Sequence, residues 1–433
     1  MSAPSQLPAT PAAPLPSRIA LTGLTVLTLI NLFNYLDRYV VSALLTDLKN
    51  AHMGLTDTRL GALMSGFLIV YLCAAPVFGA IADRGSRLRP IAVGVLLWSL
   101  ATGLSGLARN FLQLFAARAA VGIGEAAYGT IAPALLADYF VPARRGRVLA
   151  VFNMAIPVGA ALGYVVGGLV NHAYGWRAAF FAAGAPGLLL ALAVLRLPDP
   201  RRAPATPVRD SMRSRGLSHW LALYAALLRH APYRFTVLGY AAYTFAVGGL
   251  AYWMPTFLQS ARHVPAQQAS VGFGEIVVVT GVVGTLAGGW LGDLWLRYSR
   301  EGYLWLSALV TLLAAPFALV ALTAASPHLY YPAIVVAELL LFMSAGPINS
   351  AIINQVAPSE RASAIALSVF VIHLLGDVPS PLAIGALSDA SGSLATGVLI
   401  VPLAIAVSAA LWGIAALASR RSSAGVRCAA ADA

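Results

Sequence analysis

Four ionisable residues lie inside stretches of sequence that are otherwise apolar enough to cross a membrane. Asp37 and Arg38 are adjacent within residues 19–45, and Arg118 and Glu125 lie within residues 112–139. A charge at the centre of a bilayer costs about 2.5–3.5 kcal/mol on insertion scales, so such residues pair with one another and mark ion or substrate pathways. A guanidinium fork binds phosphate or carboxylate, and a carboxylate exchanges protons. These residue types predict a site that binds an anion and carries a proton.

The spacing of these residues fits helices that each have one polar face. Arg118 and Glu125 are separated by about two helical turns, which places both on the same side of their helix. Asn31 and Asn34 precede Asp37 at intervals of three residues and extend a polar stripe along the first apolar segment. We expect Arg118 to bind the anionic group. Asp37 and Glu125 are both candidates for carrying the proton, and the sequence does not rank them.

The composition is that of an integral membrane protein. Of the 433 residues, 59% are hydrophobic and 10% are charged, whereas soluble domains carry about 25% charged residues. The net charge of +12 comes from arginines in short runs between apolar stretches, where basic residues fix membrane topology. This placement argues against nucleic acid as a partner. Cys73 and Cys428 are too few and too far apart to suggest a disulfide framework or a metal site.

Twelve stretches are long and apolar enough to be transmembrane helices, which need about 20 residues each. They lie near residues 19–45, 58–82, 90–108, 112–139, 147–171, 177–196, 233–258, 270–295, 303–325, 329–355, 362–388 and 395–418. They predict an all-α membrane protein with two bundles of six transmembrane helices, over residues 18–196 and 233–418. Residues 1–17 read as a disordered N-terminal arm, residues 197–232 as a linker, and residues 419–433 as a C-terminal tail. Within the linker, HWLALYAALLRH predicts a short helix on the membrane surface.

The arginines predict the orientation of the protein in the membrane. With the linker placed in the cytoplasm, 21 of the 28 basic residues lie on the cytoplasmic side, five lie outside, and Arg38 and Arg118 lie within the membrane. Cytoplasmic loops carry an excess of arginine and lysine. We therefore expect a multi-pass protein of the cytoplasmic (inner) membrane with both termini in the cytoplasm. The high content of Ala, Arg, Gly and Pro favours a bacterial source.

The two halves of the chain show a weak internal repeat. GAIAD at 79–83 ends the second span and GWLGD at 289–293 ends the eighth, while VPARRGRVLA at 141–150 and APSERASAIA at 357–366 precede the fifth and eleventh spans. These matches at equivalent places indicate a duplication and two pseudo-symmetric bundles. Repeats of this kind build transporters whose substrate site lies between the halves, near the midplane of the membrane.

Twelve spans, a basic central loop and GAIADRGSRLR at 79–89 resemble the major facilitator superfamily. The last of these matches its G-x-x-x-D-R-x-x-R motif, and GWLGD is a degenerate counterpart. The resemblance implies that Asp83 at the end of the second span pairs with an arginine of a neighbouring loop and closes the cytoplasmic side. The residues expected to take part in this gating are Asp83, Arg84, Arg87, Arg145 and Asp293.

Further motifs resemble one branch of that superfamily, the spinster family of lipid transporters. They are NYLDR at 34–38, RAAVGIGEAAYGTIAPALLADYF at 118–140, FNMAIPVGAALGY at 152–164 and HLLGDVPSPLAIGALSD at 373–389. In the superfamily fold the first and fourth spans line a central cavity. The resemblance therefore implies that Asp37, Arg38, Arg118 and Glu125 form one cluster in which every charge has a partner.

The main hypothesis for function is a proton-coupled secondary transporter that moves an anionic amphipathic lipid by alternating access. A lysophospholipid or a molecule like sphingosine-1-phosphate would be such a lipid. Arg38, Arg118, His373 and Tyr243 are the candidate substrate-binding residues, and His373 lies at a distance of i, i+4 from Asp377. The alternative is a proton symporter for a small organic anion such as a sugar acid.

Other classes of function lack the motifs that they require. The sequence has no GxSxG element, no histidine cluster with metal spacing and no P-loop, so we expect no enzyme activity, catalytic residue, metal or cofactor. We expect a monomer whose partners are its substrate, protons and the lipid bilayer. Glu338 and Glu275 are lone acids in the tenth and eighth spans, and we expect local structural roles for both.

The predicted orientation is tested by labelling single cysteines in a variant without Cys73 and Cys428. A cysteine that replaces Ser211 is expected to react with an impermeant thiol reagent only from the cytoplasmic side, because Ser211 lies in the arginine-rich linker. A cysteine at His52 is expected to react only from outside. Reversal of either labelling pattern would overturn the orientation.

Overall fold

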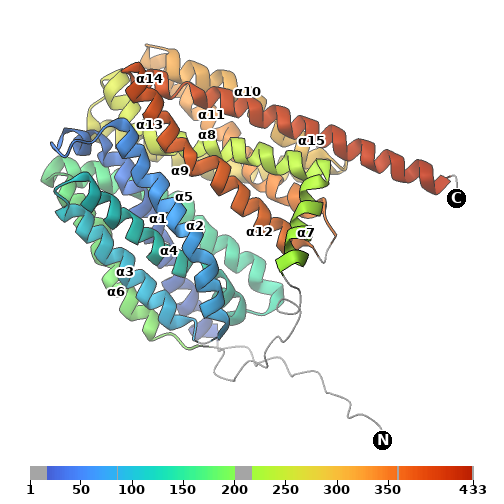
Figure 1. Cartoon of the computed structure of the whole chain (residues 1–433), viewed down its shortest axis with the longest axis horizontal. Coiled ribbons are helices and arrows are strands. Elements are labelled where there is room, and N and C mark those ends of the chain that lie inside the picture. The colour runs from blue at the N-terminus through green and yellow to red at the C-terminus, as the bar shows by residue number, and fades with distance from the viewer. Residues whose placement is uncertain (1–16, 85, 200–216, 358–359, 432–433) are drawn as a thin grey trace, which may run out of the picture.

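The computed structural model describes residues 17–84, 86–199, 217–357 and 360–431, and within these ranges it contains helices and turns but no strand (Figure 1). Residues 1–16 of the predicted arm lie outside the described ranges. The N-terminal bundle consists of α1 (Ser17–Asn50), α2 (Asp57–Arg84), α3 (Leu88–Leu107), α4 (Phe111–Tyr139), α5 (Pro142–Tyr174) and α6 (Trp176–Leu195).

The second half begins with α7 (Leu217–Arg229), the short helix predicted within the linker. The C-terminal bundle follows, with α8 (Ala231–Arg262), α9 (Ala266–Leu296), α10 (Gly302–Thr323), α11 (Pro327–Asn354), α12 (Arg361–Ile372), the π-helical turn η1 (His373–Asp377), α13 (Pro379–Ser391), α14 (Leu394–Gly397) and α15 (Ile400–Ala431). The eleventh span joins α12, η1 and α13, and the twelfth joins α14 to α15. Twelve segments of the described chain are long and apolar enough to cross a membrane, which confirms the predicted fold class. The last helix continues through the predicted tail to Ala431.

Local sequence features set two helix ends in the N-terminal bundle. The Asn110 side chain accepts a hydrogen bond from the backbone N–H of Gln113, so it caps the start of α4. Gly175 alone joins α5 to α6 with φ of 80°, a conformation that L-residues with side chains rarely adopt. The resulting tight turn holds α5 and α6 as consecutive antiparallel helices.

The two bundles pack closely along α2 and α13 and along α5 and α9. Glycines allow this approach: Gly61 of α2 lies against the backbone of Pro381, and Gly385 of α13 lies against the backbone of Asp57, where no side chain would fit. On the other pair of helices, Gly274 faces the carbonyl of Ala161. Small residues let helix backbones come together and gain dispersion energy inside a membrane, where water exclusion does not drive helix association.

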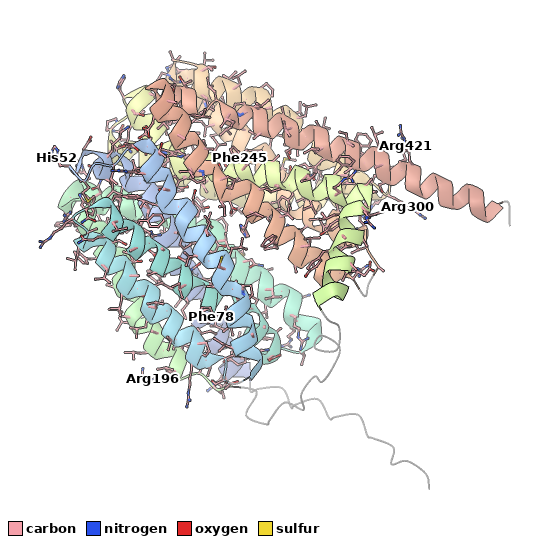
Figure 2. The ribbon with its side chains drawn as sticks, in the orientation of Figure 1. His52, Phe78, Arg196, Phe245, Arg300 and Arg421 are labelled. Carbon is pink, nitrogen blue, oxygen red and sulfur yellow. The ribbon has the colours of Figure 1, made fainter. Side chains whose placement is uncertain are left out.

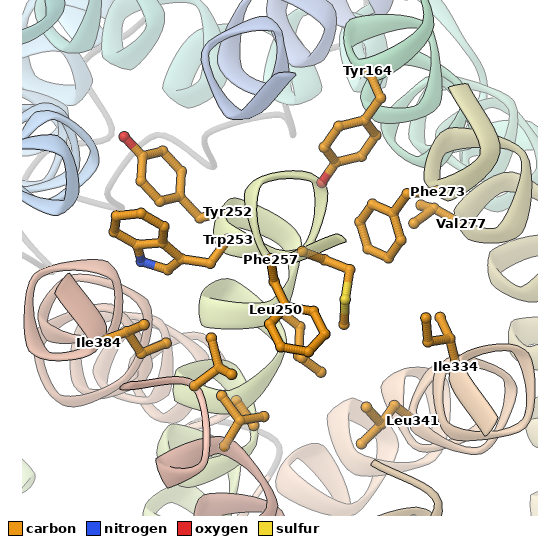
Figure 3. Close-up of a cluster of buried hydrophobic side chains, with 14 of the residues drawn as sticks. Tyr164, Leu250, Tyr252, Trp253, Phe257, Phe273, Val277, Ile334, Leu341 and Ile384 are labelled. Atoms are coloured by element: carbon orange, nitrogen blue, oxygen red, sulfur yellow. The ribbon is translucent and has the colours of Figure 1, made fainter. Parts of the chain in front are cut away.

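Three side chains connect the bundles through hydrogen bonds to backbone carbonyls. The hydroxyl of Tyr252 on α8 donates to Leu60 of α2 at 2.7 Å, and the hydroxyl of Tyr164 on α5 donates to Ala251 of α8 at 2.6 Å. Figure 3 shows both tyrosines among the buried apolar side chains that gather around α8. Ser65 of α2 makes the third such bond, to Val378 at 2.5 Å. All three lie on the half of the molecule that contains the end of α1 and the start of α2.

The opposite end of the molecule carries the arginine-rich loops, and there the bundles diverge (Figure 1). Figure 2 shows His52 at the closed end, far from Arg196, Arg300 and Arg421. At the arginine-rich end, the polar contacts between described side chains join residues of the same bundle. Arg87 pairs with Asp138 of α4. The structure is therefore closed at the end that contains His52 and separated at the arginine-rich end.

A carboxylate of one bundle caps a helix of the other at the closed end. The Asp389 side chain, on α13, accepts hydrogen bonds from the backbone N–H groups of Asp57 and Thr58 at 3.0 and 2.8 Å and from the Thr58 hydroxyl at 2.5 Å. The Asp57 carboxylate in turn pairs with Lys49 at 2.6 Å and accepts the Ser388 hydroxyl at 2.6 Å. A carboxylate at a helix N-terminus satisfies free N–H groups and complements the helix dipole. Asp389 thus links closure of this end to the first turn of α2.

The substitution Asp389→Asn is expected to favour separation of the closed end. Asparagine carries no charge and one acceptor oxygen fewer, and hydrogen bonds to charged groups contribute about 1.5–3 kcal/mol each. The equilibrium between closed and separated forms should shift by roughly tenfold to a hundredfold. Distances between spin labels placed at Arg109 and His328, exposed residues at this end of the two bundles, measure the shift.

The matched control for this experiment is Ser391→Ala, because the Ser391 hydroxyl bonds to carbonyls of its own bundle, those of Leu387, Ser388 and Ser393. This variant should keep the distance distribution of the parent protein. An Asp389→Asn distribution identical to that of Ser391→Ala would show that the cap does not hold this end closed.

Candidate functional site: two ion pairs between α1 and α4

The structure brings together the four intramembrane charges, in two ion pairs that connect α1 to α4. Arg38 Nη2 lies 2.7 Å from Glu125 Oε2, and Arg118 Nη1 lies 3.3 Å from Asp37 Oδ1. Each helix therefore supplies one cation and one anion. Because Asp37 and Arg38 are adjacent on α1 while their partners are two turns apart on α4, the four residues form one compact and electrically neutral group.

A third helix completes the hydrogen bonding of Asp37. Thr102 of α3 donates its hydroxyl to Asp37 Oδ2 at 2.7 Å, so each carboxylate oxygen of Asp37 has a donor. Glu125 is different, since its Oε2 accepts from Arg38 while its Oε1 is enclosed and has no hydrogen-bond partner among the described residues. Both oxygens of the Asp37 carboxylate thus accept hydrogen bonds, whereas Glu125 keeps one acceptor without a donor among the described residues.

Aromatic rings from α1 and α2 surround the Arg38 guanidinium. Its central carbon lies 4.9 Å from the ring centroid of Tyr35, 5.0 Å from that of Phe67 and 5.6 Å from that of Tyr71. The Arg118 guanidinium is 5.8 Å from the same Phe67 ring. Cations over aromatic faces are stabilised, and more strongly so away from water. The rings therefore stabilise both guanidinium groups beside their acids.

The two pairs differ in how far they are open to solvent. The side chains of Asp37, Arg118 and Glu125 are between 0 and 2% exposed, whereas that of Arg38 is 13% exposed. Arg38, Arg118 and Tyr252 line a narrow gap that is too small to admit a water molecule. Arg38 is therefore the most exposed member of the cluster.

Comparison with known proteins places this architecture in a family. Residues 27–377 match the sequence model of the Major Facilitator Superfamily. Protein spinster homolog 1 of Xenopus laevis is 35% identical over 374 residues, which cover 82% of this chain and 70% of that protein. The sphingosine-1-phosphate transporter SPNS2 of Mus musculus is 34% identical over 374 residues, which cover 82% of this chain and 67% of that protein. The chain belongs to the spinster family.

The fold of this spinster-family chain agrees with that assignment. A crystal structure of a bacterial homologue of the human lysosomal transporter spinster, in an inward-facing and unoccupied conformation, superposes with a TM-score of 0.80. The match covers 94% of this chain and 98% of the other, at 22% sequence identity. The family resemblance stated from NYLDR and the motif at 373–389 is confirmed, as is a multi-pass membrane protein.

The two other candidate substrate residues lie in the C-terminal bundle. His373 Nδ1 lies 2.9 Å from the Asp377 carboxylate, and both side chains are partly exposed. They occupy η1, whose glycine, Gly376, lies against Thr244 of α8. The Tyr243 hydroxyl donates to the Leu341 carbonyl at 2.8 Å and its ring is buried. Because π-helical turns often occur at functional sites, η1 supports a role for His373, while Tyr243 already has a structural partner.

The predicted gating residues lie at the arginine-rich end of the spinster-family fold. Asp83 and Arg84 occupy the last turn of α2, and their side chains lie outside what the structure describes. Arg87 is buried and pairs with Asp138 at 2.5 Å. Arg145 is exposed and its Nε donates to the Phe140 carbonyl at 3.2 Å. With the bundles separated at this end, the closing role of these residues stays a prediction.

Asp293 is the counterpart of Asp83 at the end of the eighth span. Its carboxylate accepts the hydroxyl of Tyr303, on α10 of the same bundle, at 2.6 Å. The two halves thus place an aspartate at equivalent helix ends. In the second half the partner is a tyrosine, which carries no positive charge. A gating role for Asp293 also stays a prediction.

Sequence reasoning did not single out three residues of the site: Thr102, Phe67 and Tyr71. Thr102 gives no signal of its own, because threonine is common in membrane helices and contacts Asp37 only after α3 has packed against α4. Phe67 and Tyr71 do lie four residues apart, which places both on one face of α2. That spacing is common for packing, so only the position of Arg38 identifies the face as part of the site.

The two ion pairs differ in solvent exposure, so we expect removal of the acid to reduce the stability of the protein by different amounts in the two cases. In Asp37→Ala the guanidinium of Arg118 remains enclosed without an acid, and breaking a buried pair in this way costs about 3–5 kcal/mol. Glu125→Ala is expected to cost less, because Arg38 keeps some exposure and three aromatic neighbours. Thermal unfolding of the purified variants measures both effects.

The double variant Asp37→Ala/Arg118→Leu removes both charges of the enclosed pair and is the control. It is expected to regain part of the stability lost in Asp37→Ala, since no unpaired charge remains. If the double variant is less stable than Asp37→Ala, or if Glu125→Ala is the more damaging single change, the assignment of the enclosed pair is wrong.

Proposed function

We propose that this protein is a proton-coupled secondary transporter that moves an anionic amphipathic lipid across the cytoplasmic membrane by alternating access. The observation that carries the proposal is the pair Arg38–Glu125. It combines a partly exposed guanidinium with a fully buried carboxylate at 2.7 Å. An anionic headgroup and a proton can both act on such a pair, each at a different member.

The coupling follows from competition for Arg38. A phosphate or carboxylate headgroup takes the two parallel hydrogen bonds that a guanidinium fork provides, and this weakens the bond from Arg38 to Glu125. Glu125 Oε1 already lacks a donor, so loss of Arg38 would leave a buried carboxylate without any partner. A bare buried charge is costly, and uptake of a proton removes it. Substrate binding therefore promotes protonation of Glu125.

The second ion pair, Arg118–Asp37, belongs to the same site but is more deeply buried. Arg118 and Asp37 are nearly inaccessible, and Thr102 holds Asp37 in place. This pair keeps the helices together when Arg38 leaves Glu125. It also supplies a second carboxylate for the proton if helix movements open the Arg118 side. Asp37 thus remains a candidate for proton coupling, after Glu125.

The choice of a lipid rests on the relatives. The mouse relative is named a sphingosine-1-phosphate transporter, and an Arabidopsis thaliana relative, 32% identical over 366 residues that cover 82% of this chain and 75% of that protein, is named a probable sphingolipid transporter. Aromatic side chains at Arg38 suit the apolar part of such a substrate next to its headgroup. A small organic anion has no need of these rings.

The arginine distribution supports the orientation in the membrane. Cytoplasmic loops are rich in arginine, so the separated end of the bundles faces the cytoplasm and the Asp389 cap lies on the outer side. In this orientation the region 197–232, which includes α7, and both termini lie on the cytoplasmic side. We infer a monomer that receives its substrate from the cytoplasmic side in this conformation.

The proposal is tested by measuring binding and flux on the same purified variants. Glu125→Gln is expected to lose proton-driven flux of a lysophospholipid in proteoliposomes but to keep much of its equilibrium binding, because glutamine resembles the protonated acid. Arg38→Ala is expected to lose binding by roughly thirtyfold to several-thousandfold, the cost of removing one partner of a buried charge-assisted pair. Arg38→Lys should restore only part, because a point charge cannot form the bidentate contact.

Arg109→Ala serves as the control, since Arg109 is an exposed residue at the outer end. Its flux should equal that of the parent protein. Near-normal flux in all three site variants would make the ion pairs structural only. Proton-driven uptake of sugar acids in place of lysophospholipids would favour the organic-anion symporter instead.

A further inference from the structure

A cavity of about 880 Å³ lies at the arginine-rich end of the N-terminal bundle, apart from the two ion pairs. Side chains from the first turns of α1, the start of α3 and the end of α6 line it, so the cavity belongs to one bundle. Ligand pockets commonly measure about 300–1,000 Å³. The cavity therefore has room for a ligand of the size of a lipid headgroup.

Two arginines line this cavity without an acid that neutralises them. Arg89 on α3 and Arg196 at the end of α6 are both exposed, and among the described residues neither guanidinium group has an ion pair or a hydrogen bond. Like charges that share a cavity repel each other, and an anion between them removes the repulsion. The cavity thus offers two guanidinium groups to an anionic ligand.

The one acid among the described residues of the lining, Asp199, is engaged with the start of α3. Its carboxylate accepts the backbone N–H of Arg87 at 3.2 Å. The Arg87 side chain points elsewhere and pairs with Asp138 of α4. Because Asp199 is held at the helix end, it leaves both lining arginines available to a ligand.

The cavity lies where three membrane spans begin or end. The spans of α1, α3 and α6 have their ends at Arg18, Leu88 and Leu195 on this side, so the cavity is at the level of the membrane surface. Ile19 and Leu195 of the lining are 38% and 55% exposed. Exposed apolar side chains next to guanidinium groups match the acyl chains and the anionic headgroup of a phospholipid. Basic pockets between transmembrane helices bind such headgroups.

We propose that this cavity binds an anionic phospholipid of the bilayer, with its phosphate held by Arg89 and Arg196 and its acyl chains along Ile19 and Leu195. The lipid is a resident partner and not the transported substrate, because the lining includes no residue of either ion pair. A headgroup that bridges α3 and α6 stabilises this end of the bundle, as any ligand of the folded state does. The inference requires only a membrane around the protein and holds whatever the transported substrate is.

The test compares phosphatidylglycerol with phosphatidylcholine of the same acyl chains, each added to the purified full-length protein in detergent. Native mass spectrometry measures binding, and thermal unfolding measures the stabilisation. The parent protein is expected to bind phosphatidylglycerol more tightly and to unfold at a higher temperature in its presence. Arg89→Gln/Arg196→Gln is expected to bind phosphatidylglycerol roughly tenfold to thirtyfold more weakly, the effect of two arginines near an anionic headgroup, and phosphatidylcholine unchanged.

The matched control is Arg144→Gln/Arg147→Gln. These two exposed arginines of α5 lie at the same end of the bundle but outside the cavity, so the control loses the same charge. Its affinity for phosphatidylglycerol should equal that of the parent protein. A second test variant, Ser86→Trp, keeps Arg89 and Arg196 and places a large side chain in the cavity, so it should also weaken binding of phosphatidylglycerol.

The outcomes are distinct from those that test the transport proposal. Loss of the preference for phosphatidylglycerol in the cavity variants, but not in the control, supports the lipid site. Equal binding of the two lipids by the parent protein, or the same loss in cavity and control variants, overturns it, because net charge then accounts for binding. Displacement of phosphatidylglycerol by glycerol phosphate would assign the cavity to soluble phosphates and also overturn it. None of these results bears on Arg38 or Glu125, which the flux measurements test.

Discussion

Electrical neutrality inside the bilayer is the constraint on which the N-terminal bundle depends. Four charged side chains of α1 and α4 lie at membrane depth, and three of them are between 0 and 2% exposed. Each must meet an opposite charge within hydrogen-bonding distance, which fixes the rotation of α1 against α4. Thr102 extends the constraint to α3, and the Phe67 ring, which both guanidinium groups share, extends it to α2.

The two bundles share a fold but satisfy their polar groups differently. In the N-terminal bundle every intramembrane charge has a protein partner. In the C-terminal bundle His373 and Asp377 pair within η1, whereas Glu338 is buried and has no ion pair among the described residues. The duplication has thus kept the helix arrangement while the charges diverged.

The sequence was sufficient to predict the helices and the cluster but not its internal pairing. Apolar length alone identifies twelve spans, since a bilayer imposes one length on all of them. The seven-residue spacing places Arg118 and Glu125 on one face, yet it cannot say which acid each arginine meets, because that depends on the rotation of α1. Exposure is also out of reach of the sequence, which does not distinguish Arg38, 13% exposed, from Arg118, 2% exposed, so the choice between them as the anion ligand stays a prediction. Thr102 and Asp389 act across long sequence distances, which periodicity does not detect.

Helix α2 connects closure of the outer end to the charged site. Its first turn is capped by Asp389, its Leu60 carbonyl accepts the Tyr252 hydroxyl, and Phe67, about two turns further along, contacts both guanidinium groups. Phe67 lies in the same uninterrupted stretch of α2 as the capped first turn, so a movement of that turn away from α13 would be transmitted along the helix toward the Phe67 ring. Loss of that ring would loosen Arg38 and Arg118 from their acids. Conversely, a headgroup that draws Arg38 away from Glu125 acts on α2 through Phe67 and Tyr71. In the proposed mechanism, α2 is therefore the helix through which the site and the outer contact would influence each other.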